Sequence, residues 1–541
     1  MTINTLFPAS IARASSRRLL FFMGSKRAIL FQGILTRIIV CLLAVPAIGA
    51  DVPKPAAPTA AFKAGFAERD ITPDIGMEAP GGYGKDYHRT FHDPCKVRAV
   101  VFDDGKKRVA LVGVDLLFVT RHLVQEARAE IQKRCGLSPD GVMIGASHSH
   151  SSGPIGMGEP GDYDQASPLV KELANDKSIV SDPGYTQLLK KQIVEAVVQA
   201  DAARADAKLA VGFGHEEMVS FNRRLRMKNG RTFSHPGVGN PDILGYAGPI
   251  DPQVGTVGVW DLQGHLLGVV VNFSCHATAN PGGISANWIW SMEKTLRGAT
   301  GLAALPVVFM QGACGDITQV DNLAKFQNPA AEDWCERVGG RVGAEAFKTL
   351  LLIRQGAGRD IPVDTRQKVW KIKRRAPAPE KVKRAIELVE QGPEKAGATE
   401  WTFAKEIVML DAVLQVRPDV EVEVQAVQVG PAVFVSNPAE YFVQYGLDIK
   451  QGTKFPFTFP VELANGIVGY VPTEEAMGPG GGGYETRLTA YSNLEVSAGR
   501  QFANIGIELA NQMAPGPVPL PPPPPPFRAP WAYGNLPSEL K

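Results

Sequence analysis

Cysteine is scarce in this chain. Its 541 residues include six cysteines, and no two of them form a Cys-x-x-Cys pair. The sequence therefore lacks the usual pattern of a zinc knuckle or a thiol redox site. One of the six, Cys41, belongs to the N-terminal segment. The other five are an odd number at irregular spacing, which excludes a disulfide scaffold and allows at most two bridges.

Acidic residues are missing from the first fifty positions. This segment holds six of the chain's 57 basic residues and none of its 55 acidic ones. Subtracting the six leaves 51 basic against 55 acidic residues, without a basic block, so we expect no nucleic-acid partner. Hydrophobic residues make up 44% of the chain and charged residues 21%, which is typical of a globular protein. No feature predicts a protein partner.

Apolar runs long enough to span a bilayer are also missing. The run Ile38–Val45 is too short for this. It follows a basic stretch and precedes the small residues Pro46–Ala50, an order typical of a cleaved signal peptide. We therefore predict a targeting segment over residues 1–50, with Met23 as an alternative start, and a secreted or periplasmic protein. An uncleaved N-terminal membrane anchor is the alternative.

Composition divides the rest of the chain. Residues 51–61 are rich in Pro and Ala and are interpreted as a linker. Residues 516–541 include six consecutive prolines from Pro521, so they cannot pack a core and are expected to form an extended tail. Between them, residues 62–515 can form one large domain.

Strand and helix patterns alternate along this domain. Apolar or alternating runs predict strands at Val97–Phe102 and Arg108–Val114, and helical spacing predicts helices over Leu117–Lys133 and Thr186–Ala200. This order indicates an α/β fold, with mixed sheets and helices packed on them. Functional groups gather at strand ends in such folds.

Other segments complete the expected outline. We predict a strand over Gly466–Val471 and an exposed helical pair over Pro377–Val413. Gly156–Tyr185 is polar and rich in Gly and Pro, so it is interpreted as a loop near the site. Gly478–Gly483 lacks the Gly-Lys-Ser/Thr ending of a phosphate loop and is interpreted as a mobile loop.

Two histidines stand two positions apart after the apolar run Gly141–Gly145. Side chains two apart on a strand project from the same face, so His148 and His150 could form half of a metal site. A pair of hydrogen-bonded imidazoles is the alternative. His276 follows the apolar strand His265–Phe273 in the same way, although on its own it is better explained as a core histidine.

The order of motifs over residues 62–515 resembles the neutral ceramidase family. The resemblance covers most of this range and rests on several separate motifs. The matching motifs are Asp70-Ile71-Thr72-Pro73, Ser147–Pro154 with one inserted serine, Asn222-Arg223, Ser274–Ala277, Gly315–Val320, Pro438–Tyr441, Asn465–Tyr470 and Tyr484-Glu485.

The resemblance implies a zinc site and its surroundings. The implied Zn²⁺ ligands are His148, His276, Glu440 and Tyr470. Imidazole, carboxylate and phenol groups suit zinc chemically. The implied catalytic groups around them are His150, Arg223, Tyr484 and Asp316.

The same resemblance implies an activity. We expect an exported, zinc-dependent amidohydrolase that cleaves N-acylsphingosine to fatty acid and sphingosine with metal-activated water. Its expected partner is a small-molecule or lipid substrate with an amide bond, with peripheral contact to a membrane surface left open. The alternatives are the same zinc chemistry on a non-ceramide amide or ester, and a secreted binding protein without turnover.

Three departures from the family bear on the substrate. Thr318-Gln319 replaces the family's Ser-Pro, the loop before Tyr484 is longer and Gly-rich, and the family's C-terminal immunoglobulin-like domain is not expected after the proline tail. Because similar folds change substrates by changing loops, long-chain ceramide is predicted to be a poorer substrate than for other family members.

Overall fold

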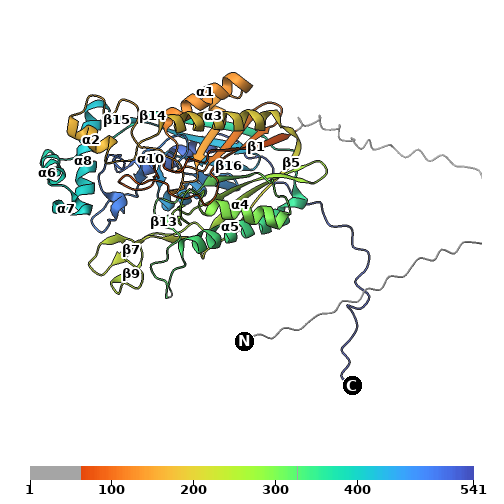
Figure 1. Ribbon diagram of the computed structural model, residues 1–541. Coiled ribbons are helices and arrows are strands. Elements are labelled where there is room, and N and C mark those ends of the chain that lie inside the picture. The colour runs from red at the N-terminus through yellow and green to blue at the C-terminus, as the bar shows by residue number, and fades with distance from the viewer. Residues whose placement is uncertain (1–61, 326) are drawn as a thin grey trace, which may run out of the picture. The chain divides into compact units, whose positions relative to one another are not determined.

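Two β-sheets pack face to face, and helices cover the outer face of each (Figure 1). The computed structural model describes residues 62–325 and 327–541. The predicted signal segment and linker at residues 1–61 lie outside the described residues. The predicted α/β fold of mixed sheets with packed helices is confirmed.

The larger sheet has eight strands. Its neighbours are antiparallel except for the pairs at its two edges, β11 with β12 and β3 with β4, which are parallel. In spatial order the strands are β12 (Val307–Gln311), β11 (Leu266–Phe273), β10 (Gln253–Asp261), β5 (Ala205–His215), β1 (Lys63–Asp70), β2 (Lys96–Asp103), β3 (Arg108–Val114) and β4 (Val142–Ala146).

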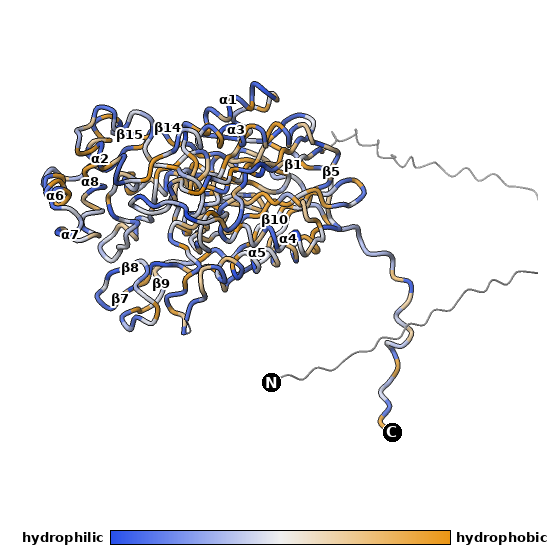
Figure 2. The backbone as a smooth tube through the Cα atoms, in the orientation of Figure 1, coloured by the Kyte–Doolittle hydropathy of each residue, from blue (hydrophilic) through white to orange (hydrophobic). Residues whose placement is uncertain are grey.

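The smaller sheet contains four strands, and the main core lies between the two sheets. Its strands are β14 (Val363–Lys373), β15 (Asp419–Val429), β16 (Ala432–Ser436) and β18 (Phe457–Val461), in that order. Phe102 and Leu111 of the large sheet meet Phe434 and Phe459 of the small sheet in this core. Figure 2 shows apolar residues concentrated in the interior, near β1 and β10.

The strand β2 illustrates how both faces of the large sheet are buried. In β2, Val97, Ala99 and Val101 face the helices, whereas Val100 and Phe102 face the other sheet. Successive strand side chains point to opposite faces, so each apolar run serves two cores at once. Burial on both faces produces the continuous apolar runs that the sequence shows.

Helices close the outer faces. Those covering the large sheet are α1 (Arg121–Cys135), α3 (Pro183–Ala202), α4 (Trp288–Thr300) and α5 (Ala331–Ile353). Those covering the small sheet are α9 (Val443–Gly452) and α10 (Ala498–Asn511). None of the described helices is long and apolar enough to span a bilayer.

Four helices form a separate cluster, here called the cap. They are α2 (Pro168–Asn175), α6 (Pro379–Gln391), α7 (Pro393–Ala396) and α8 (Ala398–Val416), and they lie together at one end of the molecule (Figure 1). They share a small core of their own, in which Leu173 packs with Val389 and Ile407. Three of these helices, α6, α7 and α8, connect β14 to β15 of the small sheet, whereas α2 comes from the segment between β4 and α3.

Several predicted boundaries differ from the structure. α1 begins at Arg121 rather than Leu117, because Thr120 caps it by accepting a hydrogen bond from the Leu123 amide at 3.3 Å. The segment Gly156–Tyr185 was predicted as a loop throughout but contains α2. The strand expected over Gly466–Val471 is reduced to β19 (Tyr470–Val471).

All five cysteines within the described range are free thiols, and four of them are buried.

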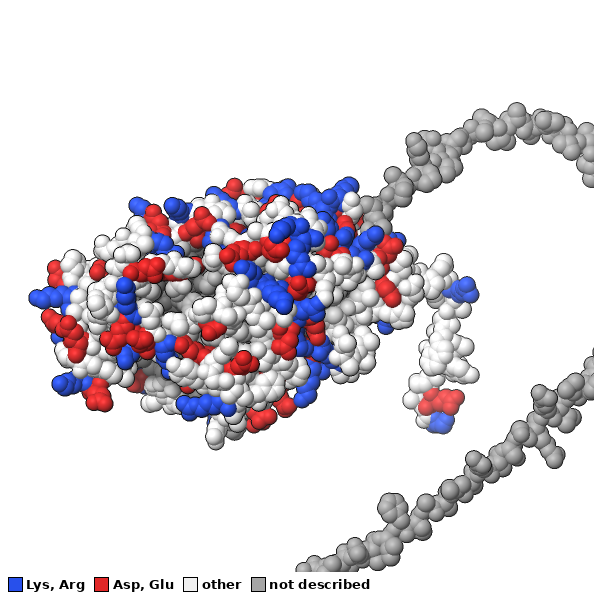
Figure 3. All heavy atoms as spheres, turned by 45° about the horizontal axis from the view of Figure 1, so that its top comes forward, with Lys and Arg blue, Asp and Glu red and all other residues white. Residues whose placement is uncertain are grey.

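On the face shown in Figure 3, acidic and basic side chains are interspersed with uncharged surface. Because neither charge dominates this face, the surface does not indicate a function, and the interior site is the better guide.

Candidate metal centre

His148 is fixed by the loop that follows β4. Its backbone is left-handed, with φ 63°, a conformation that residues with a side chain adopt only when the surroundings enforce it. Ser147 donates its amide to Val114, and Ser149 donates to Leu116. The His148 ring donates from Nδ1 to the Leu117 carbonyl at 2.9 Å, an arrangement that leaves Nε2 free to bind another group.

His276 is oriented in the same way from a different strand. It follows β11, is fully buried, and donates from Nδ1 to the Cys314 carbonyl at 2.7 Å. The rings of His148 and His276 lie 4.5 Å apart between centroids. Each histidine follows an apolar strand, and the two rings meet although β4 and β11 are not neighbours in the large sheet.

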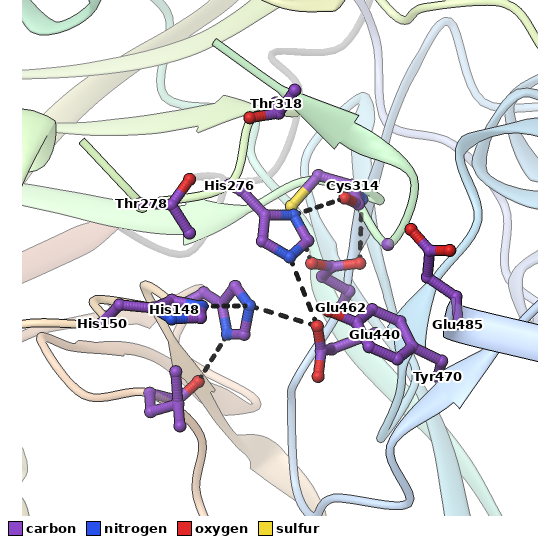
Figure 4. A network of polar contacts seen from close by, with 12 residues as sticks. His148, His150, His276, Thr278, Cys314, Thr318, Glu440, Glu462, Tyr470 and Glu485 are labelled. Atoms are coloured by element: carbon purple, nitrogen blue, oxygen red, sulfur yellow. Dashed lines mark hydrogen bonds and ion pairs between the residues drawn. The ribbon is translucent and has the colours of Figure 1, made fainter. Parts of the chain in front are cut away.

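Glu440 completes the cluster from a separate two-stranded sheet. It begins β17 (Glu440–Tyr441), which pairs in parallel with β19 so that Glu440 and Tyr470 stand directly opposite each other. Its Oε2 atom lies 3.2 Å from Nε2 of His148 and 3.3 Å from Nε2 of His276, as Figure 4 shows. Its Oε1 atom accepts a hydrogen bond from the Tyr491 hydroxyl.

The donor atoms fit a metal ion. Nε2 of His276 and Oε2 of Glu440 are buried without a hydrogen-bond partner, and buried polar atoms are rarely left in this state. His148, His150 and His276 each offer a nitrogen, and these atoms lie within 4.8 Å of one another. A cation at their centre would satisfy the atoms that the protein leaves unpaired.

The charges around the cluster also suit a cation. Burial and the Arg223 charge lower the pKa of His276 to about 3, so its ring is neutral, as a ligand must be. Burial lowers the pKa of His148, but the Glu440 carboxylate more than offsets this and the net shift is upward. Burial raises the pKa of Glu440, but His148 and His276 hold it well below its usual value. Glu440 is therefore an anion.

His150 touches the cluster and also faces a cavity. Its Nε2 atom lies 3.2 Å from Nε2 of His148. Burial, together with His148 and His276, holds its pKa well below the usual value, so the ring is neutral. Gly81, at φ 104°, packs so closely that a Cβ atom there would lie 2.2 Å from Nδ1 of His150. The close approach of Gly81 thus fixes this ring.

Three further predicted residues form one hydrogen-bonded group. Arg223 is 3% exposed and donates to the Tyr470 hydroxyl at 3.0 Å. The hydroxyls of Tyr470 and Tyr484 are 3.0 Å apart. Burial raises the pKa of Tyr470 although Arg223 opposes the shift, so the phenol keeps its proton.

Arg223 and Asp316 reach the centre only through other groups. The remaining Arg223 donors bind Glu485 at 2.8 Å and the Gly315 carbonyl at 2.7 Å. The Asp316 carboxylate accepts from the Asn222 amide at 2.8 Å and from the Val443 backbone at 2.9 Å. Both residues are buried, and their hydrogen bonds hold neighbouring chain segments together beside the centre.

A cavity of about 1440 Å³ opens onto the centre. His148, His150, Glu440, Tyr470 and Tyr484 all line it. Its walls combine apolar side chains with charged ones and include residues of the cap; examples are Leu117, Phe118, Ile155, Met409, Val413, Arg374 and Arg417. This volume exceeds that of a typical drug-sized pocket, so the cavity can hold a long substrate.

Some residues of the centre were not predicted. Tyr491 binds Glu440 through its hydroxyl, and Tyr83 packs its ring edge-on against Tyr491 at 6.2 Å. Tyr83 lies among the glycines of Gly81–Gly84, and this glycine-rich stretch was a usable signal. The loop Gly478–Gly483, predicted to be mobile, bonds to β8 (Thr232–Ser234), where Thr232 donates to the Gly480 carbonyl at 3.0 Å.

No protein-family model matches the chain. The curated neutral ceramidase of Pseudomonas aeruginosa is 26% identical over 340 residues, which make up 59% of this chain and 45% of that protein. The match thus spans less than half the length of this relative.

Two solved structures share the fold. A ceramidase complexed with C2 has a TM-score of 0.60 at 18% identity, covering 83% of this chain and 75% of that one. A crystal structure of the neutral ceramidase from Pseudomonas aeruginosa has a TM-score of 0.59 at 18% identity, covering 85% of this chain and 76% of that one. The chain is thus similar in sequence to a neutral ceramidase and shares the fold of two ceramidase structures, in agreement with the resemblance of its motifs.

Proposed function

We propose that this protein is a zinc-dependent amidohydrolase. The observation that carries the proposal is the convergence of Oε2 of Glu440 and Nε2 of His276, both buried and unpartnered, beside His148. His148, His276 and Glu440 would hold the ion, with Tyr470 completing the set. When bound, zinc would lower the pKa of a water molecule to about 7 and polarise a substrate carbonyl.

The chain's own groups supply the remaining chemistry. Neutral His150 can accept a proton at a ring nitrogen while lining the cavity. The Tyr484 hydroxyl, also in the cavity wall, can donate to the oxygen on which negative charge develops. Arg223 holds Tyr470, and Tyr470 in turn contacts Tyr484, so these groups are oriented before a substrate binds. Tyr491 occupies Oε1 of Glu440 and leaves Oε2 for the metal.

Metal content tests the proposal first. The purified protein is expected to carry about one zinc per chain, measured by elemental analysis, and His148→Ala and His276→Ala should each lose it. His150→Ala should keep zinc if His150 moves protons and lose it if His150 is a ligand. A metal-free protein whose variants fold equally well would rule out the site.

The substrate we propose is an N-acyl lipid amide of the ceramide type. The size of the cavity and its apolar wall, including Ile155, Met409 and Val413, support an acyl chain as part of the substrate. The charged residues in the same wall support the alternative, a shorter and more polar amide or ester. Both substrates would use the same metal chemistry.

A chain-length series separates these substrates. If the acyl chain is buried, each methylene contributes about 0.8 kcal/mol, or about fourfold in kcat/KM, until the cavity is full. We expect kcat/KM to rise across N-acyl sphingosines from short to medium chains and then level off. A profile that is flat from the shortest chain, with short N-acyl amines cleaved equally well, would favour the smaller substrate.

A further inference from the structure

A buried carboxylate lies behind the metal centre and touches none of its ligands directly. Glu462 follows β18 and is fully buried. Among its hydrogen-bond partners in the described chain there is no lysine or arginine, whereas the buried carboxylates of Glu293 and Glu423 are each paired with an arginine. An uncompensated buried carboxylate is costly, so its contacts call for an explanation.

The contacts of Glu462 lead to two ligand segments at once. Its Oε2 atom accepts the backbone N–H of Cys314 at 2.8 Å and the backbone N–H of Tyr441 at 2.9 Å. Cys314 is the residue whose carbonyl orients His276, and Tyr441 directly follows Glu440. Oε2 of Glu462 therefore links the loop that orients the His276 ring to β17, the strand that carries Glu440.

The second oxygen strengthens the same link. Oε1 of Glu462 accepts from the Cys314 thiol, with Sγ at 2.8 Å, and the amide of Gln311 donates to that sulfur at 2.8 Å. Figure 4 shows Glu462 and Cys314 on the side of His276 away from His150. Burial raises the pKa of Glu462 to about 8, although the nearby His148 and the N–H donors oppose the rise.

The backbone around Glu462 reaches a third ligand segment. The Leu463 carbonyl accepts the amide of Ala146, the last residue of β4, at 3.1 Å, and His148 stands two residues beyond. The amide of Glu462 itself donates to Gln311 at 3.0 Å. Residues 462–463 thus contact the segments that carry His148 and Glu440 and the loop that orients His276.

We propose that Glu462 is a positioning residue of the metal centre, which sets zinc affinity by clamping the Cys314 loop to β17. The inference rests on the proposed function. Groups that orient ligands in this way typically change metal affinity or activity by about 10–100-fold when replaced.

Two substitutions measure the clamp. Glu462→Gln keeps an oxygen for the two backbone N–H groups but places an amide N–H donor where Oε1 now accepts from the thiol, so the zinc Kd should rise about tenfold. Glu462→Leu leaves both N–H groups unpaired, so the Kd should rise about 100-fold. The Kd is measured by competition with a chromophoric chelator, and the Tm of the metal-free proteins by calorimetry.

Controls separate positioning from general stability. Glu293→Gln removes a buried carboxylate that binds Arg98 and Lys96, so it should lower the metal-free Tm and leave the zinc Kd unchanged. Cys314→Ala removes the thiol but keeps the backbone contacts, so its Kd should stay within about threefold of the unaltered value.

Two results would overturn the inference. If Glu462→Gln and Glu462→Leu lower the metal-free Tm but bind zinc as tightly as the unaltered protein, Glu462 is a structural residue only, and the proposed function stands. If the unaltered protein binds no zinc, both the proposed function and this inference are wrong.

Discussion

Glu440→Gln is expected to remove bound zinc and to lower kcat/KM by about 10³ or more. The metal contributes several kcal/mol to the transition state, and each 1.36 kcal/mol is a factor of ten in rate. The amide would put a neutral group, or an N–H donor, where Oε2 now faces Nε2 of His148 and His276 at 3.2 and 3.3 Å. Zinc content and turnover of an N-acyl sphingosine are measured on the same preparation.

The control for this variant is another carboxylate of the cavity wall. Glu126 lines the cavity, is partly exposed, and bonds to Lys190 at 3.1 Å. Glu126→Gln should therefore keep both zinc and turnover. A Glu440→Gln protein with its zinc and full activity would remove Glu440 from the centre.

Tyr484→Phe should keep its zinc and lose turnover by about 10²–10³, the usual cost of losing one hydrogen-bond donor to an oxyanion. The Tyr484 hydroxyl lies in the cavity wall and 3.0 Å from that of Tyr470, and its pKa is raised by burial, so it remains a donor at neutral pH. The fall should be in kcat more than in KM, because the contact forms in the transition state.

Tyr163→Phe is the matched control. Tyr163 also lines the cavity, but it packs against the core of the cap, so loss of its hydroxyl should leave kcat nearly unchanged. Loss of zinc from Tyr484→Phe would show that Tyr484, rather than Tyr470, contacts the metal. Unchanged kcat with zinc retained would show that Tyr484 has no part in the reaction.

The fold could be predicted from the sequence where the pattern was local. Runs such as Arg108–Val114 became strands with their predicted bounds, because burial on both faces makes the run apolar throughout. The cap could not be predicted as a unit. Its α2 is separated from α6 and α8 by about 200 residues, and nothing in either segment alone indicates that Leu173 packs against Ile407.

The site was predictable to a similar degree. His148 and His276 each follow an apolar strand, and a strand end is a recognisable position for a ligand. Glu440 and Tyr470 face each other across a pairing of only two residues per strand, which leaves no local periodicity, so only the resemblance to a family suggested them. Glu462 has one weak signal, an acid directly after the apolar run Phe457–Val461.

The origin of the ligands affects how the protein folds. His148 and Glu440 are separated by 292 positions (440 minus 148) and follow strands of different sheets, so a partly synthesised or partly folded chain cannot capture the ion. Such long-range contacts close slowly, because loop entropy must be overcome before they form. Zinc would then bind only the completed native state and stabilise it by mass action. Chelation should consequently destabilise both sheets together rather than loosen one loop.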